Sequence, residues 1–277
     1  MADGDLTTLA HVKAWLGAGA QPLPGSDDAL LRRLISAASR FVQNWLGREI
    51  ASQTYAETLD GNGNTAMLLR HWPVTAVAAL SIDGMSIPAA APPPHGNGYL
   101  LQPWDGISEA GPQQLALVGY AYHRRRQNVA VTYTAGYLAA GEAQAIPAGM
   151  PYQLPVTALA RPWNGDRGIA CAGGAPLAFV AGAAPAAGQS GLPAAGTPSY
   201  LFNVADAGKP IVVSYSYTPF DIEQACIELV ALRYKERSRI GEVSKDTGQS
   251  MRLSYSQKDM SDWTKEQLMV YRRVAMP

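Results

Sequence analysis

Side chains that could do acid–base, nucleophilic or metal chemistry are few in this sequence and lie far apart. The two cysteines, Cys171 and Cys226, cannot form a four-thiolate zinc site or a disulfide framework. None of the four histidines has a histidine or cysteine at the i+3 or i+4 spacing that brings two metal ligands together on a helix: His11, His71, His95 and His123. The sequence therefore predicts no metal ion and no other cofactor.

The motifs of known catalytic sites are incomplete. Gly188-Gln189-Ser190-Gly191 is one residue short of the Gly-x-Ser-x-Gly elbow that presents a nucleophilic serine. Gly208-Lys209-Pro210 lacks the glycine spacing and the Ser/Thr of a phosphate-binding loop. The acidic pair Asp27-Asp28 suits a helix start, where carboxylates interact favourably with the helix dipole. We expect no catalytic residue and no enzyme, because no nucleophile has a base beside it.

Two basic clusters are the strongest signals for binding. Arg124-Arg125-Arg126 could contact phosphate or an acidic partner, or it could be a solvated hairpin turn between strands that end at Tyr122 and begin at Val129. The run from Arg233 to Arg239 could face a partner in the same way, although a helix C-terminus favours cations in any case. Both interpretations of each cluster stay open.

Composition limits the classes of function. The 277 residues carry 22 basic and 22 acidic side chains, so a generic basic nucleic-acid binder is not expected. No stretch approaches the ~18 uninterrupted apolar residues of a membrane-spanning helix, and the acidic start of the chain does not resemble a signal peptide. The sequence favours a soluble, cytoplasmic protein without a membrane partner.

Hydrophobic periodicity predicts helices at both ends of the chain and strands between them. Thr7 or Thr8 is expected to cap the first helix and Ser26 the second, and the later helices begin at Pro219 and at Ser261 or Asp262. Glycines end the first three helices at Gly17, Gly47 and Gly241. The turns Gly61–Asn64 and Asp83-Gly84 predict hairpins. Strands are expected at Gln53–Leu59, Met67–Arg70, Val77–Ile82, Tyr99–Gln102, Leu115–Tyr122, Val129–Tyr133, Gln153–Leu159, Pro176–Val180, Ile211–Tyr217 and Met251–Tyr255, whereas Ala181–Gly196 reads as a flexible loop.

Charge is distributed unevenly, and this predicts the domain organisation. From Gly141 to Thr218 six of 78 residues are charged, against 19 of 57 from Asp221 to the end. We expect an α+β fold in which residues 1–140 and 219–277 form a discontinuous core. This core has a long N-terminal helix, a later helix, a C-terminal helix and β-hairpins, and residues 141–218 form a small all-β domain inserted into it.

Several segments resemble the head–tail connector (adaptor) proteins of tailed bacteriophages. The opening segments Leu6–Leu9, Val12–Leu16 and Asp27–Arg48 are similar to the short helix, loop and long helix of that family. Val131–Tyr137 and Pro219–Arg237 resemble its later strand and helix. The likeness covers residues 5–140 and 219–277, and the block between them departs from the family pattern, although Tyr200–Thr218 resembles small β-domains of other phage structural proteins.

The resemblance implies a structural protein of the virion neck that is made in the host cytoplasm. It implies a homo-oligomeric ring of twelve copies between the portal protein and a tail or neck protein, with double-stranded DNA passing through the ring without sequence-specific binding. Residues that would then face partners are Arg124, Arg125, Arg126, Arg233, Lys235, Arg237, Arg239, Trp263, Tyr271, Arg272 and Arg273.

An alternative gives the 141–218 block a binding function of its own. In that hypothesis the block is a virion-associated module that recognises a surface glycan, and Trp163, Tyr152 and Tyr200 form an aromatic platform for the sugar. The sequence does not decide between this function and the connector.

Overall fold

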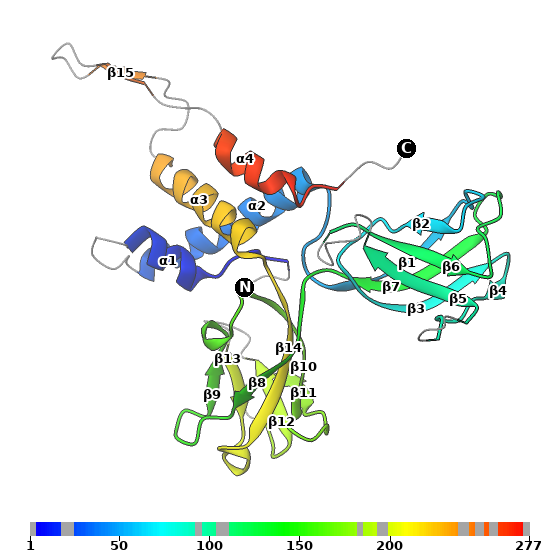
Figure 1. Cartoon of the computed structure of the whole chain (residues 1–277). Helices are drawn as coiled ribbons and strands as arrows, with labels where there is room; N and C mark the ends of the chain where they lie inside the picture. Colours follow the sequence, from blue (N-terminus) through cyan, green and yellow to red (C-terminus); the bar gives the residue numbers. More distant parts are fainter. Residues whose placement is uncertain are drawn as a thin grey trace. The chain divides into compact units, whose positions relative to one another are not determined.

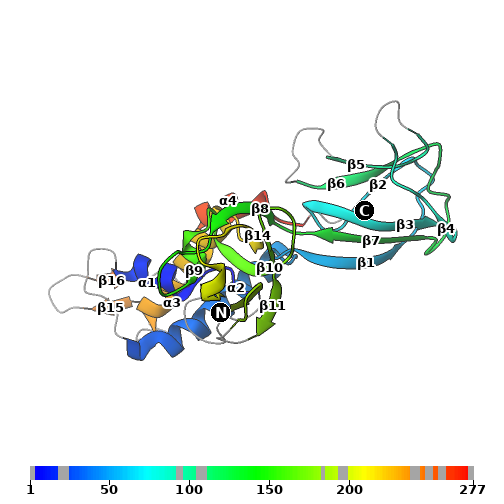
Figure 2. The ribbon, with the colours of Figure 1, turned by 90° about the horizontal axis from the view of Figure 1, so that it is seen from below.

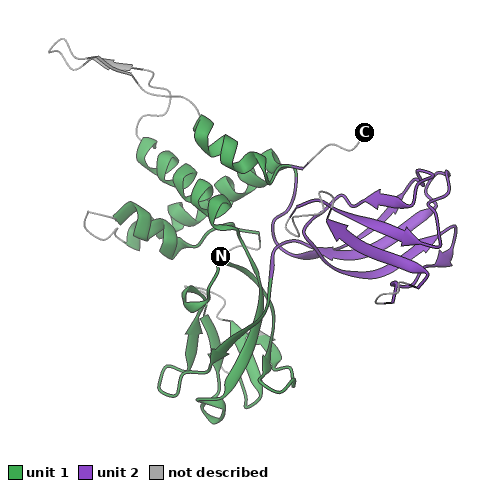
Figure 3. Ribbon diagram, viewed as in Figure 1, with its two compact units in different colours: residues 1–47, 139–272 green, residues 48–138, 273–277 purple. Residues whose placement is uncertain are grey.

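The computed structural model confirms a mixed α+β fold and divides the chain into two compact units (Figures 1 and 3). Unit 1 comprises residues 1–47 and 139–272, and unit 2 comprises residues 48–138 and 273–277. The structure describes residues 4–17, 25–91, 96–103, 111–181, 185–192, 199–237, 244–246, 252–254 and 260–273. No helix among these residues is long and apolar enough to cross a membrane.

The described residues of unit 1 form four α-helices, which begin close to the predicted positions. They are α1 (Leu9–Gly17), α2 (Asp28–Leu46, after a 3-10 turn at Gly25–Asp27), α3 (Phe220–Glu236) and α4 (Asp262–Met269). The long helix α2 buries one stripe, Leu31, Ile35, Ala38, Val42 and Leu46, as helical periodicity requires. It ends at Gly47, whose φ of 69° is the left-handed conformation that glycine adopts without strain.

Helices from the two ends of the chain pack together in unit 1. Both α1 and α2 contact α3, and α4 contacts α3 as well. The Leu6 amide donates to Ser39 Oγ at 2.9 Å, and Ser39 Oγ lies 3.5 Å from Cys226 Sγ of α3. A β-hairpin, β15 (Ser244–Asp246) with β16 (Arg252–Ser254), lies between α3 and α4 in the chain, near the strand expected at Met251–Tyr255.

The rest of unit 1 is a β lobe with a hydrophobic core of its own. One sheet has the order β10-β14-β8, from β10 (Trp163–Cys171), β14 (Pro210–Tyr217) and β8 (Leu138–Ala145). The other has the order β11-β12-β13-β9, from β11 (Ala178–Ala181), β12 (Gln189–Leu192), β13 (Ser199–Phe202) and β9 (Gln153–Pro155). The core side chains include Ile146, Leu154, Ile169, Tyr200, Val213 and Tyr215.

Two predictions for unit 1 were wrong in detail, and the strands β8, β10 and β13 were not predicted. Gln153–Leu159 is a strand only to Pro155, because a 3-10 turn follows at Val156–Ala158. The expected loop Ala181–Gly196 contains β12, which pairs in parallel with β11 and antiparallel with β13. Strand β10 was not predicted, because its pairing with β14 is interrupted by two register shifts that break the alternation of a regular strand. The predicted end of α3 at Gly241 lies outside the described residues.

Unit 2 is a sandwich of two antiparallel sheets (Figure 2). One sheet has the order β1-β7-β3-β4, from β1 (Gln53–Leu59), β7 (Val129–Ala135), β3 (Val74–Ile82) and β4 (Met85–Ser86). The other has the order β2-β6-β5, from β2 (Ala66–Leu68), β6 (Gln113–Val118) and β5 (Gly98–Pro103). Alternate residues of β7 point into the shared core, which also takes Leu80 from β3 and Leu115 from β6.

The two turns predicted as hairpins have different roles. Asp83 (φ 52°) and Gly84 (φ 81°) form the two-residue turn that joins β3 to β4, as predicted, with both residues in the left-handed region of a type I′ turn. The segment Gly61–Asn64 is not a hairpin turn, because β1 and β2 belong to different sheets. Its Gly61 amide instead donates to the Arg125 carbonyl at 2.9 Å.

The boundaries of the two compact units differ from the boundaries of the predicted domains. Residues 139–237 belong to one unit with the N-terminal helices, whereas the strands of residues 53–135 stand in the second unit. Compactness alone does not tell which segments fold independently. The division into a core of residues 1–140 and 219–277 and an inserted domain of residues 141–218 therefore stays a prediction.

Candidate interaction sites

The first candidate site is a basic tip at one end of unit 2. Leu59, Ile82 and Val129 are neighbours in the sheet register, so the loops after β1, after β3 and before β7 leave the sandwich at the same end. The basic tip is defined here as residues 123–126 with Asn62 and Asp83. Residues 123–126 lie between β6 and β7, and these two strands belong to different sheets. The hairpin turn that was considered for Arg124–Arg126 is therefore not formed.

Hydrogen bonds between the three loops fix the backbone of the basic tip. Arg125 Nη1 lies 3.1 Å from Asp83 Oδ1, and His123 Nδ1 lies 2.9 Å from Asp83 Oδ2. Arg124 Nε donates to the Asn62 carbonyl at 3.3 Å. The hydrogen bond with His123 is the main cause that lowers the pKa of the Asp83 carboxyl below its ordinary value. Arg124 and Arg125 are therefore held in place before any partner arrives.

The second group of predicted partner residues lies at the C-terminal end of α3. Arg233 is half-buried, with its guanidinium 5.3 Å from the centre of the Phe41 ring. Lys235 is exposed. Arg237 is also exposed, and its Nη1 donates to the Tyr234 carbonyl at 2.7 Å, closing the last turn of the helix. Arg239 lies outside the described residues.

The third group lies on and after α4. Trp263 is 59% exposed, so it is a surface residue of this chain. The Tyr271 hydroxyl donates to Asp221 at 3.0 Å, and the Arg272 guanidinium lies 5.4 Å from the centre of the Trp45 ring. Arg273 is exposed and belongs to unit 2. Trp263 thus lies on α4, and Tyr271 and Arg272 follow directly after it in unit 1, while Arg124–Arg126 lie in the other unit.

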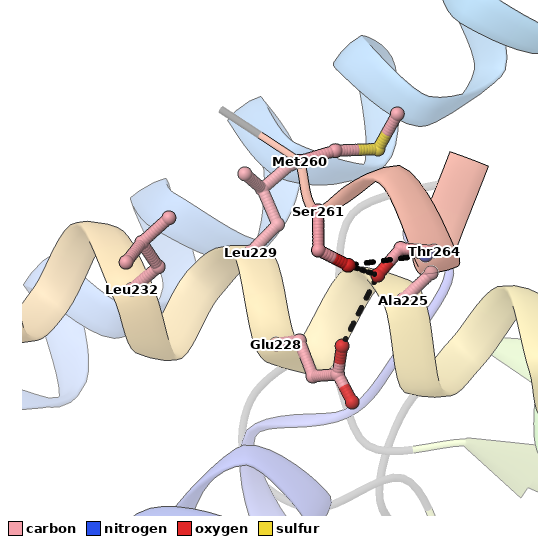
Figure 4. A pocket seen from close by; sticks show the side chains of 7 residues that line it. All are labelled: Ala225, Glu228, Leu229, Leu232, Met260, Ser261 and Thr264. Carbon is pink, nitrogen blue, oxygen red and sulfur yellow. Dashed lines mark hydrogen bonds between the residues drawn. The ribbon is translucent and has the colours of Figure 1, made fainter. Parts of the chain in front are cut away.

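A pocket of about 180 Å³ opens between α3 and the start of α4 (Figure 4). Its walls are Ala225, Glu228, Leu229, Leu232, Met260, Ser261 and Thr264. Ser261 caps α4, because its Oγ accepts from the Thr264 amide at 3.0 Å. Thr264 Oγ1 lies 3.5 Å from Glu228 Oε2, so the polar side of the pocket is organised and the remainder is mostly apolar. The predicted site did not include this pocket.

Sequence reasoning also missed a buried polar cluster between α1 and α3. Glu223 is 6% exposed, and its Oε1 lies 2.6 Å from His11 Nδ1 and accepts from Thr7 Oγ1 at 3.0 Å. The hydrogen bond with Glu223 raises the pKa of His11. The sequence indicates Glu223 as an acidic residue that interacts favourably with the N-terminal end of a helix. No local pattern reveals that its partner is His11, 212 positions away. The cluster joins helices and has the character of a structural contact.

The aromatic platform expected in the β lobe is not formed as predicted. Tyr200 is fully buried, and its hydroxyl donates to Asp166 Oδ1 at 2.9 Å and accepts from Trp163 Nε1 at 3.0 Å. Burial raises the pKa of the Tyr200 hydroxyl. Trp163 and Tyr152 are partly buried against the same core. Tyr200 therefore cannot stack on a sugar, because core positions are closed to ligands.

The cysteines and acidic residues show no grouping that would hold a metal ion within the described part of the chain. Cys226 is fully buried, and burial raises the pKa of its thiol to about 12. Such a thiol is a poor nucleophile near neutral pH, because the thiolate is the reactive form. Its role is that of a small apolar side chain in the helix packing.

Comparisons with known proteins place the chain in a family. No curated protein matches it. Two similar solved structures are the neck of an empty gene transfer agent (GTA) particle, 14% identical with a TM-score of 0.42, and the virion of a native GTA particle, 13% identical with a TM-score of 0.45. Both alignments cover 100% of this chain; they cover 95% of the chain from the empty particle and 94% of the chain from the native virion. At this low identity and TM-score, neither likeness is used to assign a family or a function.

A family model described as head completion protein matches residues 5–150, which are 146 of the 277 residues. The match includes α1, α2 and all the strands of unit 2, and it agrees with the resemblance seen in the sequence. Since it spans more than half of the chain, the protein belongs to the head completion protein family.

Proposed function

We propose that this protein is a structural component of a tailed-phage virion that acts as a head–tail adaptor. It forms a ring in the neck, between the portal and the tail or the next neck protein, and the ring continues the DNA channel. The single observation that carries the proposal is the family match over residues 5–150. In this role the protein works by binding and not by catalysis.

A ring of identical subunits needs two different complementary patches on each subunit, because its contacts are head-to-tail. The described residues offer separate exposed features that could serve, namely the basic tip of unit 2 and the α3–α4 region of unit 1. We propose a ring of twelve copies, in keeping with the resemblance to connector proteins. One set of features would meet neighbouring copies and another the portal or tail.

DNA passage fits the charge of the chain. The net charge is zero, so the ring as a whole would not hold phosphates strongly and DNA could move through it. We propose contact with double-stranded DNA without sequence-specific binding. The basic tip is then assigned to an acidic protein surface, toward which Arg124 and Arg125 are preorganised by their contacts with Asn62 and Asp83.

The β lobe is proposed to be an insertion into the adaptor. Its hydrophobic core is drawn from residues 139–217, close to the predicted block of residues 141–218. The family match ends at residue 150, near the start of this block. The alternative function, glycan recognition by the lobe, has lost part of its platform because Tyr200 is buried.

The proposal is tested by measuring the mass of the purified full chain alone and with purified portal protein. We expect a defined ring, or a complex with the portal that contains a fixed number of copies, and we expect the protein in purified virions at the neck by electron cryo-microscopy. A chain that stays monomeric with the portal and is absent from virions would overturn the proposal.

A further inference from the structure

The exposed side of α2 carries three arginines and no carboxylate. Arg32, Arg33 and Arg40 are exposed, and they are here called the arginine face of α2. At about 100° per residue, Arg33 and Arg40 lie within about 20° of each other around the helix, and Arg32 lies about 80° from Arg40. Arg33 and Arg40 therefore point away from the stripe that α2 buries, and Arg32 flanks them.

The positive charge of the arginine face is not neutralised within the described part of the chain. None of the ion pairs or side-chain hydrogen bonds of the described residues includes one of its three guanidinium groups. The single carboxylate of α2, Asp28, is already paired with Lys13. In the basic tip, by contrast, Arg125 is paired with Asp83. The arginine face therefore attracts an anionic partner.

The residues around these arginines are small or polar. The structure describes all of α2, and within it Ala37 is the one exposed residue between Arg33 and Arg40. Asn44 is exposed and Ser36 is half-buried on the same side. Protein interfaces are usually anchored by aromatic side chains, whereas phosphate groups of nucleic acids are bound by arginine together with Ser, Asn or Gln. The arginine face therefore fits a phosphate backbone better than a protein surface.

The spacing of the arginines suits a duplex in any register. Arg33 and Arg40 are seven positions apart, which corresponds to about 10.5 Å along the helix axis at ~1.5 Å per residue. Double-stranded DNA carries one phosphate per ~1.7 Å of its axis, so about six phosphates lie within that length. Both guanidinium groups can therefore reach a phosphate wherever the duplex stands, and such contacts carry no sequence information.

We propose that the arginine face of α2 is the surface at which this chain contacts the phosphate backbone of double-stranded DNA, and that it lines the channel of the ring. This inference rests on the proposed function and specifies the side of unit 1 that turns toward the channel. The basic tip of unit 2 is then left for a protein partner.

The contact is weak and exchanges readily. The 22 acidic residues of the chain balance its 22 basic residues, so the subunit as a whole does not attract DNA over a long distance. Binding through a few phosphates also falls steeply with salt, because each contact releases counterions from the DNA. A short-range arginine contact on an otherwise neutral subunit guides a duplex without holding it in one position.

DNA binding by the full chain at several salt concentrations gives the first test. The anisotropy of a fluorescent duplex of mixed sequence is measured with the wild type and with Arg33→Gln/Arg40→Gln. The variant should bind all sequences more weakly, and the slope of log affinity against log salt should fall by about 1.8 or more, since each phosphate contact contributes ~0.9. The matched control is Arg70→Gln/Arg167→Gln, which removes the same charge from exposed arginines of unit 2 and of the β lobe.

A photo-cross-link locates the contact without changing any arginine. In a Cys171→Ser background, Ala37→Cys is labelled with a thiol-reactive aryl azide, and Cys226 does not react because it is fully buried. The control is Met150→Cys, because Met150 is 84% exposed but lies in the β lobe. After irradiation with the duplex we expect DNA on position 37 and not on position 150. Equal labelling of the two positions, labelling of position 150 instead, or no labelling would overturn the inference.

The binding experiment also separates this inference from the proposed function. Equal slopes for the two double variants, or absence of DNA binding by the wild-type ring at low salt, would overturn the inference. The same holds if Arg33→Gln/Arg40→Gln keeps the DNA slope and loses portal binding, because the arginine face would then meet an acidic protein surface. In all three cases a wild-type ring, followed by mass measurement, leaves the proposed function standing. Absence of any ring, with or without portal, would overturn both.

Discussion

His11 Nδ1 lies 2.6 Å from Glu223 Oε1, although the two residues are 212 positions apart in the chain. Thr7 Oγ1 donates to the same carboxylate oxygen. One buried carboxylate of α3 therefore holds the N-terminal segment and α1. This contact joins the segments that the β lobe and unit 2 separate in sequence, and it gives the helical part of unit 1 a titratable link.

The stability of the chain should respond to pH through this link. The hydrogen bond with Glu223 raises the pKa of His11, and burial acts against it. A group whose pKa is raised by folding contributes stability that is complete below its unfolded-state pKa of about 6.5 and is lost as the pH rises through the folded-state pKa. The contribution of His11 to the free energy of unfolding should therefore be smaller at pH 8 than at pH 6, as measured by urea titration.

The controls for this prediction separate His11 from His71. Burial lowers the pKa of His71 in unit 2, so its contribution changes with pH in the opposite direction. The wild type is therefore compared with His11→Gln and with Glu223→Gln. In both variants the part of the pH dependence that destabilises the protein at high pH should disappear. If both keep the wild-type profile, the pair does not titrate as described.

Gly61 should be intolerant of any side chain. A Cβ atom at this position would lie 1.8 Å from the His123 carbonyl oxygen, which is part of the backbone and cannot turn aside. We expect Gly61→Ala to lower the free energy of unfolding by about 1–3 kcal/mol, the range for overpacked sites. It should also displace the loop that carries Arg124–Arg126.

The matched substitution is Gly149→Ala, because a Cβ there would meet nothing within 4 Å. Chemical denaturation of the two variants measures the difference. Equal stability of Gly61→Ala and Gly149→Ala would show that the loops of the basic tip are not held as closely as the structure has them.

The sequence was sufficient for the helix positions because their ends depend on local chemistry. Gly47 ends α2 in the left-handed conformation, and Asp28 begins it. Local patterns failed where pairing decides the structure. Strand β10 contains Gly165 and Gly168 at irregular register, so its alternation is lost.

The candidate sites show the same division. The exposure of the basic tip could be predicted from three consecutive arginines, since such a run is rarely buried. The contact of Arg125 with Asp83 could not be predicted, because Asp83 is 42 positions away and appears in the sequence simply as a turn residue. The pocket between α3 and α4 likewise arises from packing between helices and has no sequence motif.

Charge reversal in the basic tip should impair particle assembly without unfolding the protein. Arg126 is exposed, so Arg126→Glu should leave the urea midpoint unchanged while virion yield in an infection complementation assay falls by about tenfold or more, as expected when a rim charge turns repulsive. Arg125→Glu is different, because it would place a second carboxylate beside Asp83 and should also loosen the loop. Normal virion yield with Arg126→Glu would reject the assignment of this residue to a partner surface.

Tyr200 should matter for stability and not for ligand binding. Its hydroxyl joins Asp166 to Trp163 inside the β lobe. Tyr200→Phe therefore removes one donor from the half-buried Asp166 carboxylate, which keeps the Gly168 amide, and leaves the Trp163 indole N–H without its acceptor. The expected loss is about 1–3 kcal/mol in the free energy of unfolding. Tyr152→Phe is the matched control, because Tyr152 packs against the same core and none of the described contacts uses its hydroxyl. Glycan-array binding by the wild type that is abolished in Tyr200→Phe at unchanged stability would contradict this prediction and restore the sugar platform.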